Sequence, residues 1–333
     1  MRKRYNAAIT ALGGYVPETI LSNHDLEKMV DTNNEWIISR TGIHERRILN
    51  DDTLATSDLA TMAVKTLLED SKINPDEIEC VIVATATPDY IMVSTASIVC
   101  EKAGLKNAWG VDSNAACSGF LYALTLGSSL IESGRYKNVI VIGADANSSI
   151  VNYEDRNTCI LFGDGAGAVL LEQTEQDTGI VDNVFKTDGV GKEHLIVTAG
   201  GSLHPSSVST LDNKLNYISQ NGRIVFKAAI EGMTQTCGDI LQRNELTTDD
   251  VDWLIPHQAN LRIIQAVGDK LGLAEDKVKV NIQRYGNTTA ATIPLCMWEY
   301  KNDFKENDNM LLTAFGAGFS WGATYLKWGK LRG

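Results

Sequence analysis

The chain has 333 residues, of which 44% are hydrophobic, and its formal net charge at pH 7 is −12. This length is enough to bury a substantial core, either in one large domain or in two fused ones. The negative charge argues against a nucleic-acid partner, which usually requires a basic surface. No stretch reaches the roughly 18–20 apolar residues that a membrane span needs, so no membrane partner is expected.

Residues 1–4 are basic, and residues 5–14 have the pattern of a strand without the small-residue cleavage site of a signal peptide. We therefore expect the first strand of the fold at this position. The six cysteines lie at positions 80, 100, 117, 159, 237 and 296, without a CxxC pair or a regular spacing. This usage is typical of reduced thiols in a cytoplasmic protein.

Predicted strands and helices alternate along the whole chain, which favours an α/β fold with buried sheets. Residues 57–84 and 226–257 each predict a helix, a polar break and a buried strand, and the two segments are offset by 173 residues. An offset close to half the chain indicates a duplicated domain and not a solenoid. We expect an N-terminal half over residues 1–173 and a C-terminal half over residues 174–333.

Residues 186–221 interrupt this alternation, because they are polar, rich in Gly and Ser and only weakly periodic. Loops of this length often bind ligands or act as lids. A plain surface excursion fits the same composition equally well.

Cys117 lies in the sequence Asn-Ala-Ala-Cys-Ser-Gly-Phe of residues 114–120, where an apolar run leads into a helix predicted over residues 115–133. The N-terminal end of a buried helix stabilises a thiolate through its free N–H groups and its dipole. The alternative is a small buried hydrophobic residue, which is the usual role of a free cysteine. We prefer that alternative for the other five cysteines, whereas the motif around Cys117 favours a nucleophile.

His257 and Asn287 occupy similar settings in the C-terminal half. His257 follows an apolar strand, at whose carboxyl end α/β folds place their sites, and Asn287 precedes an apolar helix. A structural histidine and a helix-capping asparagine are the alternatives for the two residues taken singly. Papain-like proteases also use Cys, His and Asn, so the residue types leave hydrolysis and carbon–carbon bond formation open. The other histidines form no recognisable metal site.

Residues 30–36 (Val-Asp-Thr-Asn-Asn-Glu-Trp), residues 40–47 (Arg-Thr-Gly-Ile-His-Glu-Arg-Arg) and the terminal Gly-rich strand closely resemble the β-ketoacyl-acyl-carrier-protein synthase III family. These are the initiating condensing enzymes of type II fatty-acid synthesis, in the thiolase superfamily. The resemblance implies a homodimer with a thiolase-like fold of five layers, α-β-α-β-α. Asn287 stands where the elongating synthases have a second histidine, which indicates the initiating class.

The resemblance also implies a reaction and a role for each group. An acyl-CoA primer would acylate Cys117, while the backbone N–H groups of Cys117 and Ala317 hold the oxyanion. Malonyl-acyl-carrier-protein would then lose carbon dioxide, and His257 and Asn287 would stabilise the resulting enolate by hydrogen bonds. Attack on acyl-Cys117 would give a β-ketoacyl-acyl-carrier-protein, without a metal or any other cofactor.

The resemblance further suggests binding positions. Five residues match contacts to CoA, namely Thr32, Trp36, Arg40, Arg156 and Asn260, with Trp36 and Arg156 enclosing the adenine. Four match positions that dock the acidic acyl carrier protein, namely Lys227, Gln258, Arg262 and Lys270. Core packing is the alternative for Trp36. Asp269 departs from a position that is basic in some relatives, which weakens docking on an acidic chain.

Met92 stands where acetyl-specific relatives have a phenylalanine that reaches the acyl pocket across the dimer interface. Methionine is flexible, so this wall is expected to accept branched or longer primers. Two other enzyme classes remain as alternatives. One is a secondary-metabolite starter enzyme that uses malonyl-CoA, and the other is a Cys-His thioester hydrolase or acyltransferase. The lack of an acidic residue in the motifs argues against a hydrolase and against a hydroxymethylglutaryl-CoA synthase, and a non-catalytic paralogue would not need all three groups.

Overall fold

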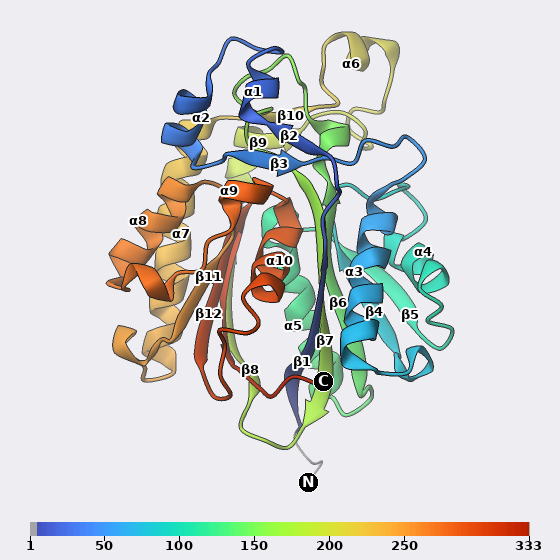
Figure 1. Ribbon diagram of the computed structural model, residues 1–333, viewed down its shortest axis with the longest axis vertical. Coiled ribbons are helices and arrows are strands. Elements are labelled where there is room, and N and C mark those ends of the chain that lie inside the picture. The colour runs from blue at the N-terminus through green and yellow to red at the C-terminus, as the bar shows by residue number, and fades with distance from the viewer. Residues whose placement is uncertain (1–4, 333) are drawn as a thin grey trace.

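The computed structural model describes residues 5–332, and it is built around two β-sheets that face each other across a central pair of helices (Figure 1). The basic residues 1–4 lie outside the described part. The first sheet has the order β1-β7-β6-β4-β5, with bounds Asn6–Tyr15, Asp164–Thr174, Asn138–Ala146, Cys80–Ala84 and Trp109–Ser113. The second has the order β11-β12-β13-β8, with bounds Trp253–Pro256, Asn309–Gly316, Ser320–Lys327 and Gly179–Thr187.

The second sheet repeats the strand directions of the first. In each sheet the first strand along the chain pairs antiparallel with the last, as β1 pairs with β7 and β8 with β13. The next pair, β6 with β7 and β12 with β13, is also antiparallel, and the parallel pairs β4–β6 and β11–β12 follow. A single parallel bridge from Leu254 to Val278 stands where β5 pairs with β4 in the first sheet. All strands of the first sheet end by Thr174, and all those of the second begin at Gly179 or later.

The helices form three layers around the two sheets, giving the five layers, α-β-α-β-α, that the sequence resemblance implies (Figure 1). The outer layers are α3 (Thr56–Ser71) with α4 (Thr95–Lys102) on one side and α7 (Gly222–Arg243) with α8 (Leu261–Leu271) on the other. The central layer contains α5 (Gly119–Glu132) and α10 (Thr292–Glu299). Both central helices are rich in apolar residues and lie between two apolar sheet faces, which is the environment that such helices require.

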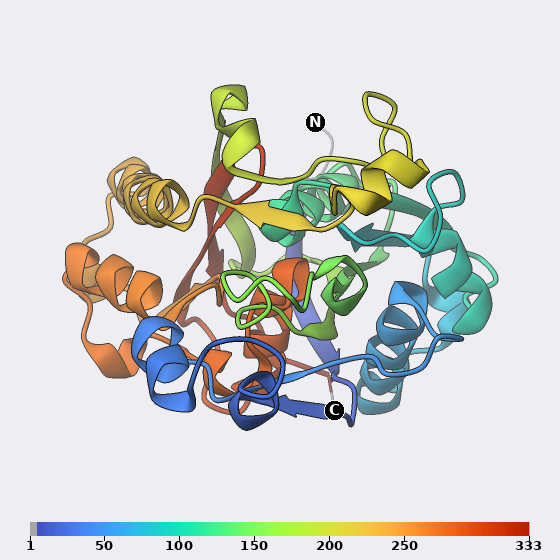
Figure 2. The ribbon, with the colours of Figure 1, turned by 90° about the horizontal axis from the view of Figure 1, so that it is seen from above.

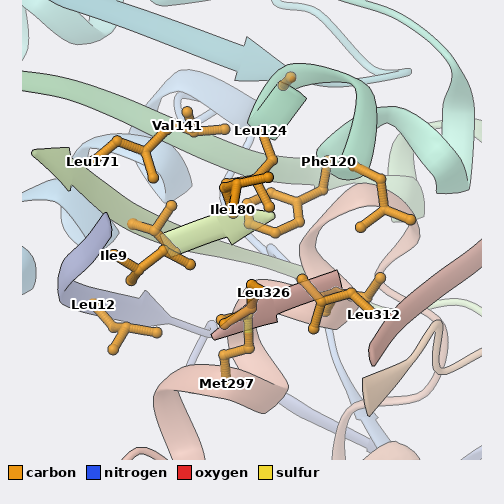
Figure 3. Close-up of a cluster of buried hydrophobic side chains, with 14 of the residues drawn as sticks. Ile9, Leu12, Phe120, Leu124, Val141, Leu171, Ile180, Met297, Leu312 and Leu326 are labelled. Carbon is orange, nitrogen blue, oxygen red and sulfur yellow. The ribbon is translucent and has the colours of Figure 1, made fainter. Parts of the chain in front are cut away.

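The largest hydrophobic cluster joins the two sheets through the central helices (Figure 3). Phe120 and Leu124 of α5 pack with Val141 of the first sheet and Leu312 of the second, and all four side chains are fully buried. Burial of one such side chain contributes about 1.5–3 kcal/mol. Close approach is needed as well, because a Cβ on Gly127 of α5 would lie 2.8 Å from Val141. The two halves therefore share one core.

Short elements gather at one end of the molecule, at the top of Figure 1 and facing the viewer in Figure 2. From the N-terminal half come β2 (Ile20–Ser22), α1 (Asn23–Leu26), α2 (Asn34–Thr41) and β3 (Glu45–Arg47). From the C-terminal half come β9 (Leu195–Val197), α6 (Val208–Asp212), β10 (Ile218–Gln220) and α9 (Ile282–Tyr285). None of the helices within residues 5–332 is long and apolar enough to cross a membrane.

Candidate active site

A cavity of about 810 Å³ brings together Cys117, His257 and Asn287 at the end of the molecule where the short elements gather. The cavity also contacts Ala317, one of the two expected oxyanion residues, and Asn260. Among the residues that the structure describes, no aspartate or glutamate lines it. The three side chains that were predicted to act together, from segments up to 170 residues apart in sequence, therefore share one largely apolar cavity.

The polar segment 186–221 contributes to the wall of this cavity. Lining residues come from its 3-10 turn, from β9 and the loop that follows it, and from β10, namely Lys192, Leu195, Ile196, Val197, Ala199, Gly200, Gly201, Ile218 and Gln220. Of the two interpretations open from the sequence, binding loop or surface excursion, the structure supports the binding loop. The glycines and serines of the segment obscured its short apolar run at residues 195–197.

Cys117 lies in a short 3-10 turn, Ala116–Ser118, and α5 begins only at Gly119. The predicted helix start at residue 115 is therefore wrong by four residues. Ala116 has a φ of +45°, a left-handed conformation that non-glycine residues adopt at a cost and that is frequent at active sites. This sharp turn presents the sulfur to the cavity, where Cys117 is 7% exposed.

The turn at Cys117 is held against the loop that follows β12. Ser118 Oγ donates to the carbonyl of Ser320 at 2.8 Å, and Ser320 Oγ donates to the carbonyl of Ala115 at 3.2 Å. A Cβ on Gly316 would lie 2.9 Å from the backbone N of Cys117, so only glycine permits this approach. The loop thereby brings the Ala317 backbone next to that of Cys117, as an oxyanion site requires.

The electrostatic surroundings of Cys117 differ from the sequence-based expectation of a stabilised thiolate. Burial, together with the charge of Asp145, raises the pKa of the Cys117 thiol to about 12. Hydrogen bonds with the side chains of Thr289 and Asn287 oppose this shift but do not cancel it. Cys117 lies two residues before the start of α5, and its burial outweighs the effect of the helix dipole, which falls off within the first turn. These surroundings favour the neutral thiol of Cys117 over its thiolate.

His257 follows the last residue of β11, where its backbone N–H donates to the Thr313 carbonyl at 2.8 Å. Its ring is buried, and Nδ1 lies 2.7 Å from Thr292 Oγ1 at the start of α10. Burial lowers the pKa of His257 to about 3, so the imidazole is neutral at physiological pH. Neither His257 nor Cys117 carries a charge in the resting site.

Asn287 lies just before the 3-10 turn Thr289–Ala291, and its side-chain orientation is defined by a hydrogen bond. The backbone N–H of Thr289 donates to Asn287 Oδ1 at 2.8 Å. Because the oxygen is used within the turn, the Nδ2 amino group is the end that faces outward. The structure therefore combines the two roles that the sequence left open, since the oxygen stabilises a turn and the nitrogen remains available as a donor.

Two residues that follow the apolar part of β6 hold this turn in place, and neither was predicted from the sequence. Asp145 is fully buried, and its two oxygens accept the backbone N–H groups of Ala86 and Ala290 at 2.7 and 2.9 Å. Asn147 Oδ1 accepts the hydroxyl of Thr289 at 2.8 Å. Burial raises the pKa of Asp145 to about 7, while the two N–H donors favour the ionised form. The sequence signal that could have identified Asp145 is its position directly after the apolar run of β6.

The predicted adenine site is closed in this structure. The guanidinium carbon of Arg156 lies 5.1 Å from the centroid of the Trp36 ring, and Arg156 donates to the Asp31 carbonyl at 2.8 Å. An aromatic base between the two would need about 7 Å, since each stacked layer takes roughly 3.5 Å. Arg156 must therefore move outward before a base can enter. Trp36 is partly buried and packs against a hydrophobic cluster, so the alternative of core packing accounts for part of its surface.

Of the other three residues matched to CoA contacts, Asn260 lines the cavity, whereas Thr32 and Arg40 do not. Asn260 Nδ2 donates to the Arg40 carbonyl at 3.0 Å, which links α2 to α8. The Arg40 side chain is exposed. Thr32 Oγ1 is buried without a hydrogen-bond partner among the described residues.

One of the four predicted carrier-protein contacts is wrong. Gln258 is fully buried, and its side-chain amide nitrogen, Nε2, donates to the carbonyls of Pro256 and Lys279. A side chain with no exposed surface cannot contact a carrier protein. Lys227, Arg262 and Lys270 are exposed on α7 and α8, as a docking role requires. Arg262 also lies 5.3 Å from the ring of Phe226, which lines the cavity.

Met92 does not line the cavity of its own chain. Its exposed fraction is 95%, and that of the neighbouring Ile91 is 92%. Both belong to the segment between β4 and α4, whose residue Pro88 does contact the cavity. Within residues 5–332 there is no cluster of three or more His, Cys, Asp or Glu side chains that could hold a metal ion.

Comparisons with known proteins agree with this geometry. The family model of 3-oxoacyl-[acyl-carrier-protein (ACP)] synthase III matches residues 111–189, and the model of its C-terminal part matches residues 241–328. The beta-ketoacyl-[acyl-carrier-protein] synthase III of Phocaeicola vulgatus is 53% identical over 327 residues, which cover 98% of each chain.

Solved structures give the same result. The 3-oxoacyl-[acyl-carrier-protein] synthase III of Aquifex aeolicus superposes with a TM-score of 0.89 at 41% identity, covering 97% of this chain and all of the other. A priming beta-ketosynthase of a polyketide biosynthetic pathway has a TM-score of 0.90 at 28% identity, with 99% and 98% of the chains covered. The chain belongs to the β-ketoacyl-[acyl-carrier-protein] synthase III family.

Proposed function

We propose that this chain initiates fatty-acid synthesis in the cytoplasm by condensing an acyl-CoA primer with malonyl-acyl-carrier-protein. The products are a β-ketoacyl-acyl-carrier-protein, CoA and carbon dioxide. The observation that carries the proposal is the shared cavity of Cys117, His257 and Asn287, in which the Asn287 amide is oriented as a donor. Family membership supports the same reaction.

The first half-reaction transfers the acyl group from CoA to Cys117. The sulfur attacks the thioester carbonyl, and the backbone N–H groups of Cys117 and Ala317 stabilise the tetrahedral oxyanion. The carbon–sulfur bond to CoA then breaks, and the proton of the Cys117 thiol ends on the sulfur of the leaving CoA. The Cys117 thiol loses its proton as the sulfur attacks, because the thiolate is the reactive form, and the leaving CoA thiolate takes up a proton, so the exchange leaves no net charge in the apolar cavity.

The second half-reaction forms the carbon–carbon bond. His257 and Asn287 donate hydrogen bonds to the thioester carbonyl of the malonyl group, and the carboxylate leaves as carbon dioxide. The electron pair that remains forms an enolate, whose oxygen the same two donors stabilise. The enolate carbon attacks the acyl carbonyl on Cys117, and the released thiolate takes one proton from water. None of these steps requires a metal or another cofactor.

The absence of acidic residues from the described cavity lining favours condensation over hydrolysis. In Cys-His hydrolases an acidic or amide side chain orients the histidine so that it can act as a base. Here the partner of the His257 ring is the hydroxyl of Thr292. A starter enzyme of a secondary pathway that accepts malonyl-CoA remains the second candidate, favoured by the structural match to a priming β-ketosynthase.

The proposed substrate contacts divide between two surfaces. CoA enters past Trp36 and Arg156, with Thr32, Arg40 and Asn260 along its path, after Arg156 has moved off the indole ring. The acyl carrier protein docks on the exposed cations of α7 and α8, which are Lys227, Arg262 and Lys270. Arg262 is central to this surface, because its contact with Phe226 places it beside the cavity.

The proposed assembly is a homodimer formed along β5. This strand is the last in its sheet, so one of its two edges has no strand partner among the described residues. Trp109 and Val111 on β5 are 42% and 39% exposed, and large apolar side chains are unusual on a strand edge that faces water. Dimerisation there would extend the first sheet and bring Met92 of one chain to the acyl pocket of the other.

The test supplies purified protein with a panel of acyl-CoAs, followed by malonyl-acyl-carrier-protein or malonyl-CoA, and analyses enzyme and products by mass spectrometry. We expect acyl mass on the Cys117 peptide and a β-ketoacyl-acyl-carrier-protein, and neither with Cys117→Ala. Product from malonyl-CoA alone would select the secondary-pathway candidate. Acyl-enzyme that only hydrolyses, with no new carbon–carbon bond, would refute the condensing function.

A further inference from the structure

The ring of His257 has one hydrogen-bond partner within the described side chains, and that partner is Thr292. Thr292 Oγ1 lies 2.7 Å from His257 Nδ1, and both residues are buried. The other ring nitrogen, Nε2, is the one left to serve the cavity. A neutral imidazole carries a single N–H, so whether Nε2 donates or accepts depends on what happens at Nδ1.

The hydroxyl of Thr292 has one proton and two candidate acceptors. The Thr289 carbonyl lies 3.1 Å from Oγ1, beyond the usual 2.5–3.0 Å range of O–H···O bonds, whereas Nδ1 lies at 2.7 Å. The same carbonyl already accepts the backbone N–H of Thr292. It therefore remains satisfied when the hydroxyl turns away, whereas Nδ1 has no second donor in the described structure.

We propose that Thr292 is a positioning residue that donates its hydroxyl proton to Nδ1 and thereby keeps the hydrogen of His257 on Nε2. This inference rests on the proposed function, in which His257 must donate to the thioester carbonyl. A neutral ring with hydrogen on Nε2 does so while carrying no charge.

A carboxylate in the place of Thr292 would have the opposite effect. It would hold the hydrogen on Nδ1, make Nε2 an acceptor and favour the imidazolium, as in Ser-His-Asp hydrolases. An imidazolium beside the malonyl carboxylate would also stabilise that carboxylate before decarboxylation and so oppose its loss. The hydroxyl group avoids both effects, since it can donate and is uncharged.

The experiment compares Thr292→Val, which has a similar shape but no hydroxyl, with Thr292→Ser, which keeps it. Acyl transfer to Cys117 and decarboxylation of malonyl-acyl-carrier-protein are measured separately. In Thr292→Val we expect acyl transfer within about threefold of the parent and a kcat for decarboxylation roughly 10²-fold lower, the size of effect seen when one oxyanion donor is lost. Thr292→Ser restores most of the rate.

The matched control is Thr313→Val, which removes another fully buried hydroxyl next to His257, one that donates to the Gly322 carbonyl at 2.9 Å. We expect this variant to keep both half-reactions. A loss in Thr313→Val as large as in Thr292→Val would show that general packing, and not the bond to Nδ1, is responsible.

The tautomer is read directly from the nitrogen-15 chemical shifts of His257 in the full-length protein labelled at histidine, with His257→Gln for assignment. We expect hydrogen on Nε2 in the parent protein and in Thr292→Ser. Hydrogen on Nδ1 in the parent, or full decarboxylation by Thr292→Val, would overturn the inference. If the parent formed no β-ketoacyl product, the proposed function would fail, yet the shifts would still decide the tautomer. The shifts of the parent and of Thr292→Ser also decide it if Thr292→Val does not fold.

Discussion

At the scale of single residues, the site is built to stay uncharged until substrate arrives. Cys117 and His257 are both buried, and burial shifts their pKa values in opposite directions, to about 12 and about 3. Each shift favours the neutral form of its own group. A thiolate–imidazolium pair, as in papain-like proteases, is therefore not the resting state of this cavity.

This state predicts the pH dependence of alkylation. At pH 8 a thiol with a raised pKa has a smaller thiolate fraction than an ordinary cysteine, and that fraction grows as the pH increases toward the raised value. We expect the rate of Cys117 alkylation by iodoacetamide to be still rising at pH 9.5, above the ordinary cysteine pKa of about 8.5. The measurement follows the mass of the Cys117 peptide over time, with a short cysteine peptide as reference. A plateau below pH 8 would show a stabilised thiolate instead.

The convergence of three side chains in one cavity was what the sequence predicted best. Cys117, His257 and Asn287 each follow or precede an apolar segment, and such positions converge at one end of an α/β sheet. Gln258 could not be judged in this way, because the direction of a side chain just after a strand depends on the elements packed around it. Thr292 lies within the same motif as Asn287, but its bond to a ring 35 residues away exists only in the folded chain.

At the scale of elements, the turn that carries Asn287 is held in a strained conformation from outside. Thr289 has a φ of +53°, which is rare for a β-branched residue and persists only when the surroundings enforce it. Asp145 and Asn147 of the N-terminal half provide this through the N–H of Ala290 and the hydroxyl of Thr289. Contacts between segments about 145 residues apart explain why helix propensity and periodicity gave no warning of the strain.

Asp145→Asn tests this support. An amide has one oxygen, so the N–H of Ala86 or that of Ala290 would face another donor, at a cost of about 1–3 kcal/mol. We expect the free energy of unfolding in urea to fall by this amount, and kcat for condensation to fall because Asn287 is displaced.

Asp112→Asn is the matched control for Asp145→Asn. Asp112 accepts the backbone N–H groups of Thr95 and Ala96 at the start of α4, at 2.7 and 2.8 Å, and it does not line the cavity. We expect a similar loss of stability in this variant with kcat retained. Equal values of kcat in both variants would show that Asp145 supports the fold without positioning the Asn287 turn.

At the scale of the whole molecule, the 173-residue offset between similar segments predicted the duplication. It predicted only part of the arrangement of the site. The offset predicts equivalent strands, and the two sheets repeat the same order of parallel and antiparallel pairs. It does not predict the role of residues 186–221, which connect β8 to α7 as residues 16–55 connect β1 to α3 and which line the cavity. Nor does it predict the segment around Met92, whose exposure has no explanation within one chain.

That exposure leads to a prediction about the dimer. Covering a methionine that is 95% exposed would remove apolar surface from water, and the edge of β5 that has no strand partner among the described residues offers the surface for a second chain. If Met92 completes the partner's acyl pocket, Met92→Phe should lower kcat/KM for branched or longer primers by about 10-fold or more relative to acetyl-CoA. Light scattering on a sizing column should show a mass twice that of the 36.3 kDa chain.

Mixed dimers decide which pocket Met92 serves. When one chain carries Met92→Phe and the other Cys117→Ser, the working cysteine has the unchanged Met92 of its partner beside it, so the preference for longer primers should persist. When one chain carries both changes, the working cysteine of the other chain has the new phenylalanine beside it, and the preference should shift to acetyl-CoA. The opposite pattern would place Met92 at the pocket of its own chain, and a shift in neither dimer would remove it from primer selection.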